Sequence, residues 1–394
     1  MWKKWISFTL LLLSLWVWSL HVSAEEDVQE VDPEKWVHEQ LQSDSFDTIG
    51  AYWGSVKQSY GEYLPDITNK NLTDFVKDDA PLSIMNWIKG IGKYLLHELF
   101  LNGKLLGSLI LLTLFAVILQ TVQNAFDSKS VNKIAYAVVY LVLITLALSS
   151  FSLAVSYTNN AVEAMSNFMI ALLPLVLSIL ASVGSITSVA FFHPIILFLI
   201  HTSGVIISTV VLPLFFLSAL LHIVSSLNEH YKATQLANLL RNIGMTIMGV
   251  FLTIFLGVIS IQGAAAAITD GIAVRTAKFV TGNFIPVIGR MFTDAADTVI
   301  SASMLLKNTI GIVGVITVLA IALFPAVKVF VISLIYKLAA AIVQPIGGGP
   351  IVKTLDLISK HILYVFTGLL MVTMMFFFSI VILIAASNLT VLMR

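Results

Sequence analysis

Residues Ile362–Ala386 read ILYVFTGLLMVTMMFFFSIVILIAA and contain no charged side chain. A helix of about 20 apolar residues crosses the roughly 30 Å hydrocarbon core of a bilayer, so this stretch predicts a membrane-spanning helix. Five further stretches are also long and apolar enough to cross: Leu105–Val122, Ile134–Tyr157, Val189–Val224, Ile243–Ile268 and Ile310–Ile335. The sequence therefore predicts an all-α polytopic membrane protein with about six transmembrane helices.

The composition of the 394-residue chain agrees with this prediction. Hydrophobic residues make up 58% and charged residues 11%, against about 25% charged residues in a typical soluble domain. The 22 basic and 22 acidic residues cancel, and a balanced chain without a basic patch is not expected to bind nucleic acid. The chain has no cysteine, so it has neither disulfides nor a thiol nucleophile.

The amino-terminal residues have the pattern of a secretory signal peptide over 1–24. Two lysines, Lys3 and Lys4, precede the apolar run Ile6–Leu20, and Val22-Ser23-Ala24 places small residues before Glu25. The alternative is an uncleaved signal anchor. In both cases we expect residues 25–80, which hold most of the acidic side chains, to form an exported acidic head.

Residues 81–103 predict an amphipathic helix between the head and the membrane domain. Apolar residues recur at helical spacing, and Lys89 and Lys93 lie on another face. Such a helix can lie in the membrane interface with its aromatic side chains at headgroup depth. The alternative is that it packs against the rest of the protein.

Two apolar segments, Phe168–Val183 and Phe284–Leu306, are borderline as membrane spans. Basic residues concentrate in cytoplasmic loops, and this rule favours two re-entrant hairpins that enter and leave on the same side. The chain then crosses six times, residues 158–167 form an outer loop, and the basic loops share the inner side: 125–133, 225–242 and 337–361. If both segments cross fully, the chain makes eight crossings.

The membrane domain, residues 104–394, also contains signs of an internal duplication. Pro174 and Pro286 are separated by the same offset of about 112 residues as Pro213 and Pro325. The predicted units cover about 125–236 and about 237–348, followed by an additional span at 360–386. Two crossings per unit make the repeats parallel, and three make them inverted.

Several polar residues within the apolar stretches are candidate functional residues, because ionisable groups are costly at bilayer depth. Arg290, Asp294 and Asp297 follow i, i+4, i+7 spacing on one helical face. They form either a self-neutralised structural cluster or a functional site. His193 and His201 share a broad helical face and predict either hydrogen bonds to a neighbouring helix or a proton relay.

A hydroxyl-bearing stripe, Thr145, Ser149, Ser152 and Ser156, follows the second predicted span. Small and hydroxyl side chains usually mediate contacts between membrane helices, so helix packing is the default interpretation and the lining of a polar conduit is the alternative. The sequence contains none of the common catalytic motifs. We therefore expect no enzyme activity, no metal and no cofactor.

The signal, the acidic head and the polytopic body occur together with two local strings, Phe284-Ile285-Pro286-Val287-Ile288-Gly289 and Asp294-Ala295-Ala296-Asp297. In this combination the chain resembles the stage III sporulation protein AE family along its whole length. The resemblance implies a subunit of a multiprotein channel or secretion complex that joins mother cell and forespore during endospore formation. It transfers no catalytic or ligand-binding residue.

The same resemblance implies where the protein acts and with what. It places the chain in the mother-cell membrane around the forespore, with the amino-terminal head in the intermembrane space. The implied partners are other membrane and ring-forming subunits, a secretion-type ATPase of the mother cell and a forespore protein, and the complex supports late forespore gene expression. The alternative function is a secondary transporter of a small solute, which the repeat, the hairpins and the charged residues would suggest.

Overall fold

A computed structural model of the chain describes residues 44–64, 84–125, 131–182, 186–227, 233–284, 288–347 and 349–392. These residues are almost entirely helical and contain no strand. The predicted signal peptide and most of the acidic head lie outside the described residues. The all-α prediction is therefore confirmed for the part of the chain that the structure describes.

The described residues form a succession of helices. In chain order they are α3 (Asp44–Tyr60), η1 (Gly61–Tyr63), α6 (Ile84–Leu101), α7 (Gly103–Ala125), α8 (Val131–Ser182), α9 (Ile186–Val205), the π-helical segment η2 (Ile206–Val211), α10 (Leu212–Leu227), α11 (Thr234–Phe284), α12 (Ile288–Val343) and α13 (Pro350–Leu392).

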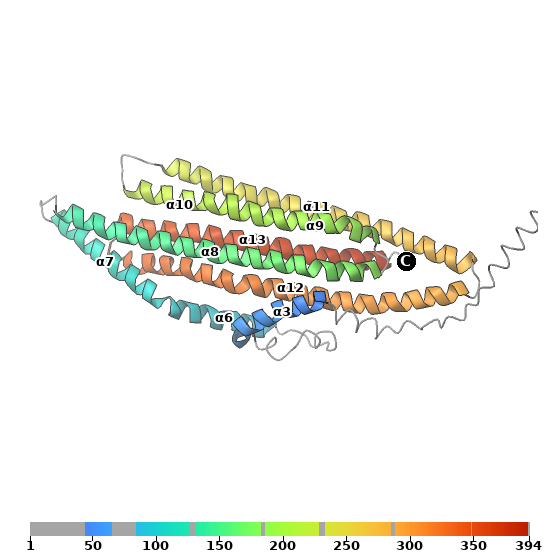
Figure 1. Ribbon diagram of the computed structural model, residues 1–394. Helices are drawn as coiled ribbons and strands as arrows, with labels where there is room; N and C mark the ends of the chain where they lie inside the picture. The colour runs from blue at the N-terminus through green and yellow to red at the C-terminus, as the bar shows by residue number, and fades with distance from the viewer. Residues whose placement is uncertain are drawn as a thin grey trace, which may run out of the picture.

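The long helices form one elongated bundle in which α8, α9–α10, α11, α12 and α13 run side by side (Figure 1). Helix α13 is central, since it packs against α8, α10, α11 and α12. Its inward face is fully buried at Val365, Leu369, Val372 and Phe376. The apolar core is therefore continuous along the bundle rather than confined to one layer.

Six helical stretches in the described residues are long and apolar enough to cross a membrane. They are Gly103–Val122, Ala137–Ser182, Phe192–Ser226, Thr234–Ala273, Leu306–Val343 and Pro350–Ala385. This confirms the predicted number of membrane helices. Most are longer than one crossing requires: α12 has 56 residues, about 84 Å at roughly 1.5 Å per residue.

The two re-entrant hairpins are not confirmed. Residues 168–182 continue α8, which passes through Pro174 without a break, and residues 288–306 are the first turns of the continuous α12. The expected outer loop 158–167 is also helical. A proline lacks one helical hydrogen bond, but neighbouring helices make it tolerable in membrane helices, so neither Pro174 nor the polar residues after Tyr157 end the helix.

The internal duplication is also not confirmed. Pro213 is the second residue of α10, and the π-helical segment η2 lies just before this helix. The wider π-helical turn accommodates a residue that lacks a backbone N–H. Pro325, its expected equivalent, lies in the middle of α12. The two prolines therefore have different structural settings.

The helix ends that flank the three loops predicted to share the inner side lie at one end of the bundle (Figure 1). They are the facing ends of α7 and α8, of α10 and α11, and of α12 and α13. The arrangement agrees with pairs of antiparallel helices that return the chain to the same end each time.

The described part of the head packs onto the side of the bundle. Tyr60 stacks on Phe324 of α12 with ring centroids 3.7 Å apart, and Tyr52 meets Phe168 of α8 edge-to-face at 5.4 Å. Tyr63 of η1 contacts Tyr94 of α6 at 4.9 Å. The head segment 44–64 therefore packs in a defined position against α6, α8 and α12.

Helix α6 has two apolar faces. Trp87, Ile91, Leu95 and Leu99 pack against the core, so one face of this helix lies on the bundle. Met85, Ile88, Leu96 and Phe100 are exposed, Phe100 to 82%. Its location in the membrane interface remains a prediction, which the outer face favours.

The buried carboxylate of Glu98 joins α6 to α12. Lys328 Nζ lies 3.8 Å from Glu98 Oε1, and Asn102 donates hydrogen bonds to Glu98 at its backbone oxygen and its carboxylate. Burial, together with the hydrogen bond to Glu98 and its charge, raises the pKa of Tyr94 above its ordinary value. Tyr94 therefore remains a neutral hydrogen-bonding phenol in this cluster.

Candidate functional site: an exposed polar face on α8

A line of polar side chains follows the exposed face of α8. Successive members are three or four residues apart, and all are exposed: Thr145, Ser149, Ser152, Ser156, Asn160, Glu163 and Asn167. This spacing keeps residues on one face of a helix. From Thr145 to Asn167 the line measures about 33 Å at roughly 1.5 Å per residue, close to the thickness of a hydrocarbon core.

The opposite face of α8 fixes the direction in which these residues point. Leu143, Phe151, Met165, Phe168 and Leu172 are 3% exposed or less, and α8 packs through this face on α12 and α13. Because the apolar side is held in the core, the polar line must face outward. We call the residues from Thr145 to Asn167 in this line the polar face of α8.

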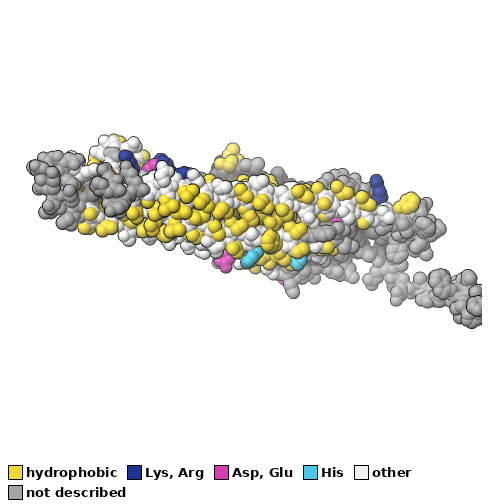
Figure 2. Space-filling view, turned by 90° about the horizontal axis from the view of Figure 1, so that it is seen from above, with side chains coloured by type: hydrophobic (Ala, Val, Ile, Leu, Met, Phe, Trp, Pro, Cys, Tyr) yellow, Lys and Arg dark blue, Asp and Glu magenta, His cyan; other side chains and the backbone are white. Residues whose placement is uncertain are grey.

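Between residues 243 and 273 the exposed side of α11 carries large apolar side chains and a few hydroxyls, but no amide or carboxylate. Val250 and Ile254 are each 54% exposed, Ile261 is 73% exposed and Ile272 is 62% exposed. Figure 2, seen from above α10 and α11, shows hydrophobic side chains in a broad band along the bundle. The molecule thus presents an apolar surface suited to lipid and a polar face that is not suited to it.

The hydroxyl stripe of the sequence prediction is part of this polar face, but it does not pack between helices of the chain. Thr145, Ser149, Ser152 and Ser156 are exposed, and Thr145 Oγ1 bonds the backbone oxygen of Leu141 one turn earlier. The stripe therefore does not lie between helices of this chain. Contact with a helix of another subunit and the lining of a polar conduit both stay predictions.

Three members of the polar face were missed in the sequence, namely Asn160, Glu163 and Asn167. They fell in the region read as an outer loop, where the polar cluster after Tyr157 lowers the local hydropathy. Their signal was the unbroken continuation of the spacing that joins Thr145 to Ser156.

His193 and His201 lie on the exposed side of α9. Helix α9 packs beside α8, and Gly204 comes close to Val162 and Ser166 of α8. His201, one turn from Gly204, is therefore near the level of Glu163. The histidines extend the polar character of this side of the bundle and are not buried between helices.

Arg290, Asp294 and Asp297 lie in the first turns of α12. The helical backbone keeps them at i, i+4 and i+7 on one face, but their side chains fall outside the described part of the structure. The polar face of α8 does not depend on them.

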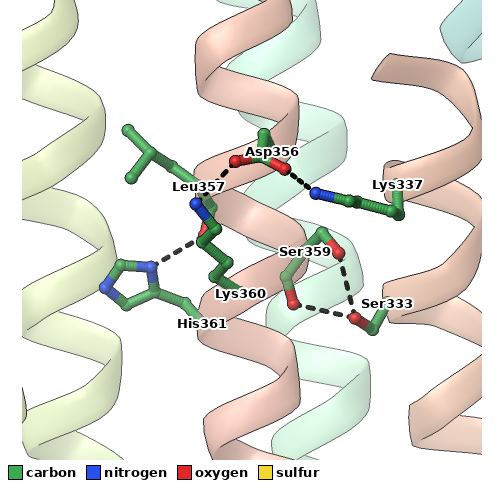
Figure 3. A network of polar contacts seen from close by, with 7 residues as sticks. All are labelled: Ser333, Lys337, Asp356, Leu357, Ser359, Lys360 and His361. Carbon is green, nitrogen blue, oxygen red and sulfur yellow. Dashed lines mark hydrogen bonds and ion pairs between the residues drawn. The ribbon is translucent and has the colours of Figure 1, made fainter. Parts of the chain in front are cut away.

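A second group of polar residues crosslinks the helices. Lys337 of α12 and Lys360 of α13 both pair with Asp356, and Ser333 of α12 bonds Ser359 of α13 (Figure 3). The bond between the two buried serines satisfies polar groups that would be costly to bury without a partner.

Two further residues in the core, Tyr140 and Ser218, make hydrogen bonds that join different helices. Tyr140 of α8 bonds Ser226 of α10 at 2.5 Å and Thr354 of α13 at 2.7 Å. Ser218 of α10 lies 3.1 Å from His361 Nε2 and donates to the backbone oxygen of Ala237. These bonds fix the register of α8, α10, α11 and α13.

The described residues contain no cluster of three or more His, Asp or Glu side chains that could hold a metal ion. The polar face of α8 consists of hydroxyl, amide and carboxylate groups along a line, which is the arrangement of a surface in contact with water or a partner. It offers hydrogen bonds along its length.

Comparison with known proteins decides the family. Residues 67–387 match the family model for stage III sporulation protein AE. The chain belongs to the stage III sporulation protein AE family. A stage III sporulation protein AE of Bacillus subtilis (strain 168) is 57% identical over 348 residues, covering 88% of this chain and 87% of the relative.

The family match confirms the resemblance read from the sequence. Together with the six apolar helices, it makes this chain a multi-pass membrane protein of sporulation. The names of the stage III sporulation protein AE family and of its relative describe a sporulation protein and no enzyme. The comparison with solved structures found no match.

Proposed function

We propose that this chain is a non-catalytic membrane subunit of a multiprotein channel that links mother cell and forespore, with the polar face of α8 in contact with the water-filled path. The observation that carries the proposal is the contrast between the exposed faces of α8 and α11. Hydroxyl, amide and carboxylate groups over about 33 Å are unfavourable against lipid. They are suited to a conduit.

In this proposal the chain acts in the mother-cell membrane around the forespore, with its acidic head in the intermembrane space. Ring-forming and other membrane subunits complete the conduit, a secretion-type ATPase in the mother cell energises it, and a forespore protein meets it from the opposite membrane. The complex sustains late forespore gene expression. Segment 44–64 packs against α6, α8 and α12, and this packing supports a head that is held in a fixed position for docking.

A secondary transporter is the less favoured function. That alternative drew on re-entrant hairpins and a duplication, and the structure gives continuous helices in both regions. The exposed line on α8 is also open along one side of the bundle, whereas a transporter encloses its solute site between repeats.

The two functions predict different results for the purified protein. Tagged protein from sporulating Bacillus subtilis that lacks its own relative should co-purify with other membrane proteins. In liposomes, the isolated protein should accumulate none of a panel of labelled amino acids and sugars under a sodium or proton gradient. Uptake by the isolated protein, abolished by Asp294→Asn or Asp297→Asn, would instead establish the transporter.

A further inference from the structure

Two lysines from different helices share one carboxylate at the end of the bundle that holds the α12–α13 connection. Lys360 Nζ lies 2.8 Å from Asp356 Oδ2, and Lys337 of α12 pairs with Oδ1 of the same side chain. Lys337 and Lys360 are 57% and 55% exposed, and Asp356 is 28% exposed. Figure 3 shows both lysine nitrogens directed at Asp356. An ammonium group has three donors, so each of these exposed lysines keeps donors that Asp356 does not use.

Two more cations belong to the same end of the bundle. Lys353 lies two turns before Lys360 on α13 and is exposed. Arg241 of α11 lies over the ring of Tyr364, one turn after Lys360, at 5.7 Å. Within the described residues of 212–250 and 330–365, Asp356 is the single acidic side chain. The cluster therefore has a clear positive excess.

The same helices carry exposed apolar side chains within about five residues of these cations. Leu239 of α11 is 54% exposed, Ile342 of α12 is 49% exposed and Leu363 of α13 is 40% exposed. Figure 2 shows several Lys and Arg side chains gathered near one end of the hydrophobic band. A phosphate beside acyl chains has the matching arrangement of charge and apolar surface.

We infer that Lys337, Lys353, Lys360 and Arg241 bind the phosphate of an anionic phospholipid whose acyl chains lie along α11, α12 and α13. Asp356 holds two of the ammonium groups in position without cancelling the positive charge. Basic pockets between membrane helices bind such headgroups, and each Lys or Arg near a membrane surface contributes a favourable attraction. This inference does not depend on the proposed channel function.

Lipid titration of the purified full-length protein in a neutral detergent tests the inference. Phosphatidylglycerol should raise the thermal unfolding temperature more than phosphatidylcholine or inorganic phosphate does. Lys337→Gln combined with Lys360→Gln should weaken the apparent affinity for phosphatidylglycerol by about thirtyfold. Arg275→Gln, an exposed cation elsewhere on α11, should leave this affinity unchanged.

Two further variants separate binding from folding. Lys337→Arg with Lys360→Arg retains the charge and should retain most of the affinity. Lys353→Gln leaves both pairs with Asp356 in place and should weaken binding about fivefold. Equal stabilisation by phosphatidylcholine, equal stabilisation by inorganic phosphate, or unchanged phosphatidylglycerol affinity in both glutamine variants would overturn the inference.

Discussion

Asn160→Leu combined with Glu163→Met should reduce the number of heat-resistant spores by about tenfold or more, the factor that a barrier higher by roughly 1.4 kcal/mol gives. Both substitutions keep side-chain size similar and remove the polar atoms from the centre of the α8 face. Apolar constrictions in a conduit hinder its passage by excluding water. The variant is produced in sporulating Bacillus subtilis that lacks its own relative, and spores are counted after heating.

The chain offers a closely matched control for this experiment. Thr145 on α8 and Thr253 on α11 are both exposed, and each hydroxyl bonds the backbone oxygen four residues earlier. Thr145→Leu should lower spore formation, and Thr253→Leu should not, because the second residue lies on the apolar side. Equal effects at the two threonines, with equal protein in the membrane, would contradict a special role for α8.

Gly90→Ala should weaken the packing of the head segment 44–64 against the bundle, so that the segment dissociates from it more often. A Cβ atom at Gly90 would overlap the backbone oxygen of Tyr63 and lie 3.0 Å from its carbonyl carbon. A backbone atom cannot move aside without shifting η1. Overpacking of this kind costs roughly 1–3 kcal/mol, which raises the population of the released form about five- to 150-fold.

Trypsin cleavage after Lys57 in α3 measures this release, since proteolysis follows the open population when opening is fast. Gly92→Ala is the control on the same helix, because no atom lies within 4 Å of its added Cβ. Both substitutions give α6 the same gain in helix propensity, about 1 kcal/mol. Similar cleavage rates in the two variants would show that the contact between Gly90 and Tyr63 does not keep segment 44–64 on the bundle.

The sequence correctly predicted the features that depend on the length of each apolar segment, namely the membrane helices. Ile362–Ala386 identifies the central helix without any other information, and the six apolar helices are confirmed. Basic residues also indicated which helix ends lie together. These features follow from the cost of polar groups in hydrocarbon, which acts on each segment separately.

The features that were wrong or missed depend on which side of a helix a residue occupies, or on distant contacts. Asn160 and Glu163 lowered the average hydropathy, so their region was read as a loop, although the buried side of the same turns carries Met165 and Phe168. Gly90 contacts Tyr63 of a different helix. Helical spacing relates only residues a few positions apart, so it could not predict this contact. Such contacts arise only when the helices pack.

Single cysteines test the central claim most directly, because the chain has no native cysteine. Cysteine replaces Ser152, Ser156 or Asn160 on α8, and Thr253 or Val258 on α11, and membranes of sporulating cells receive a charged methanethiosulfonate reagent. Thiols react as thiolates, which form in water. We expect reaction at the three α8 positions and none at the two α11 positions, whereas reaction at α11 with α8 unreactive would contradict a water-facing polar face.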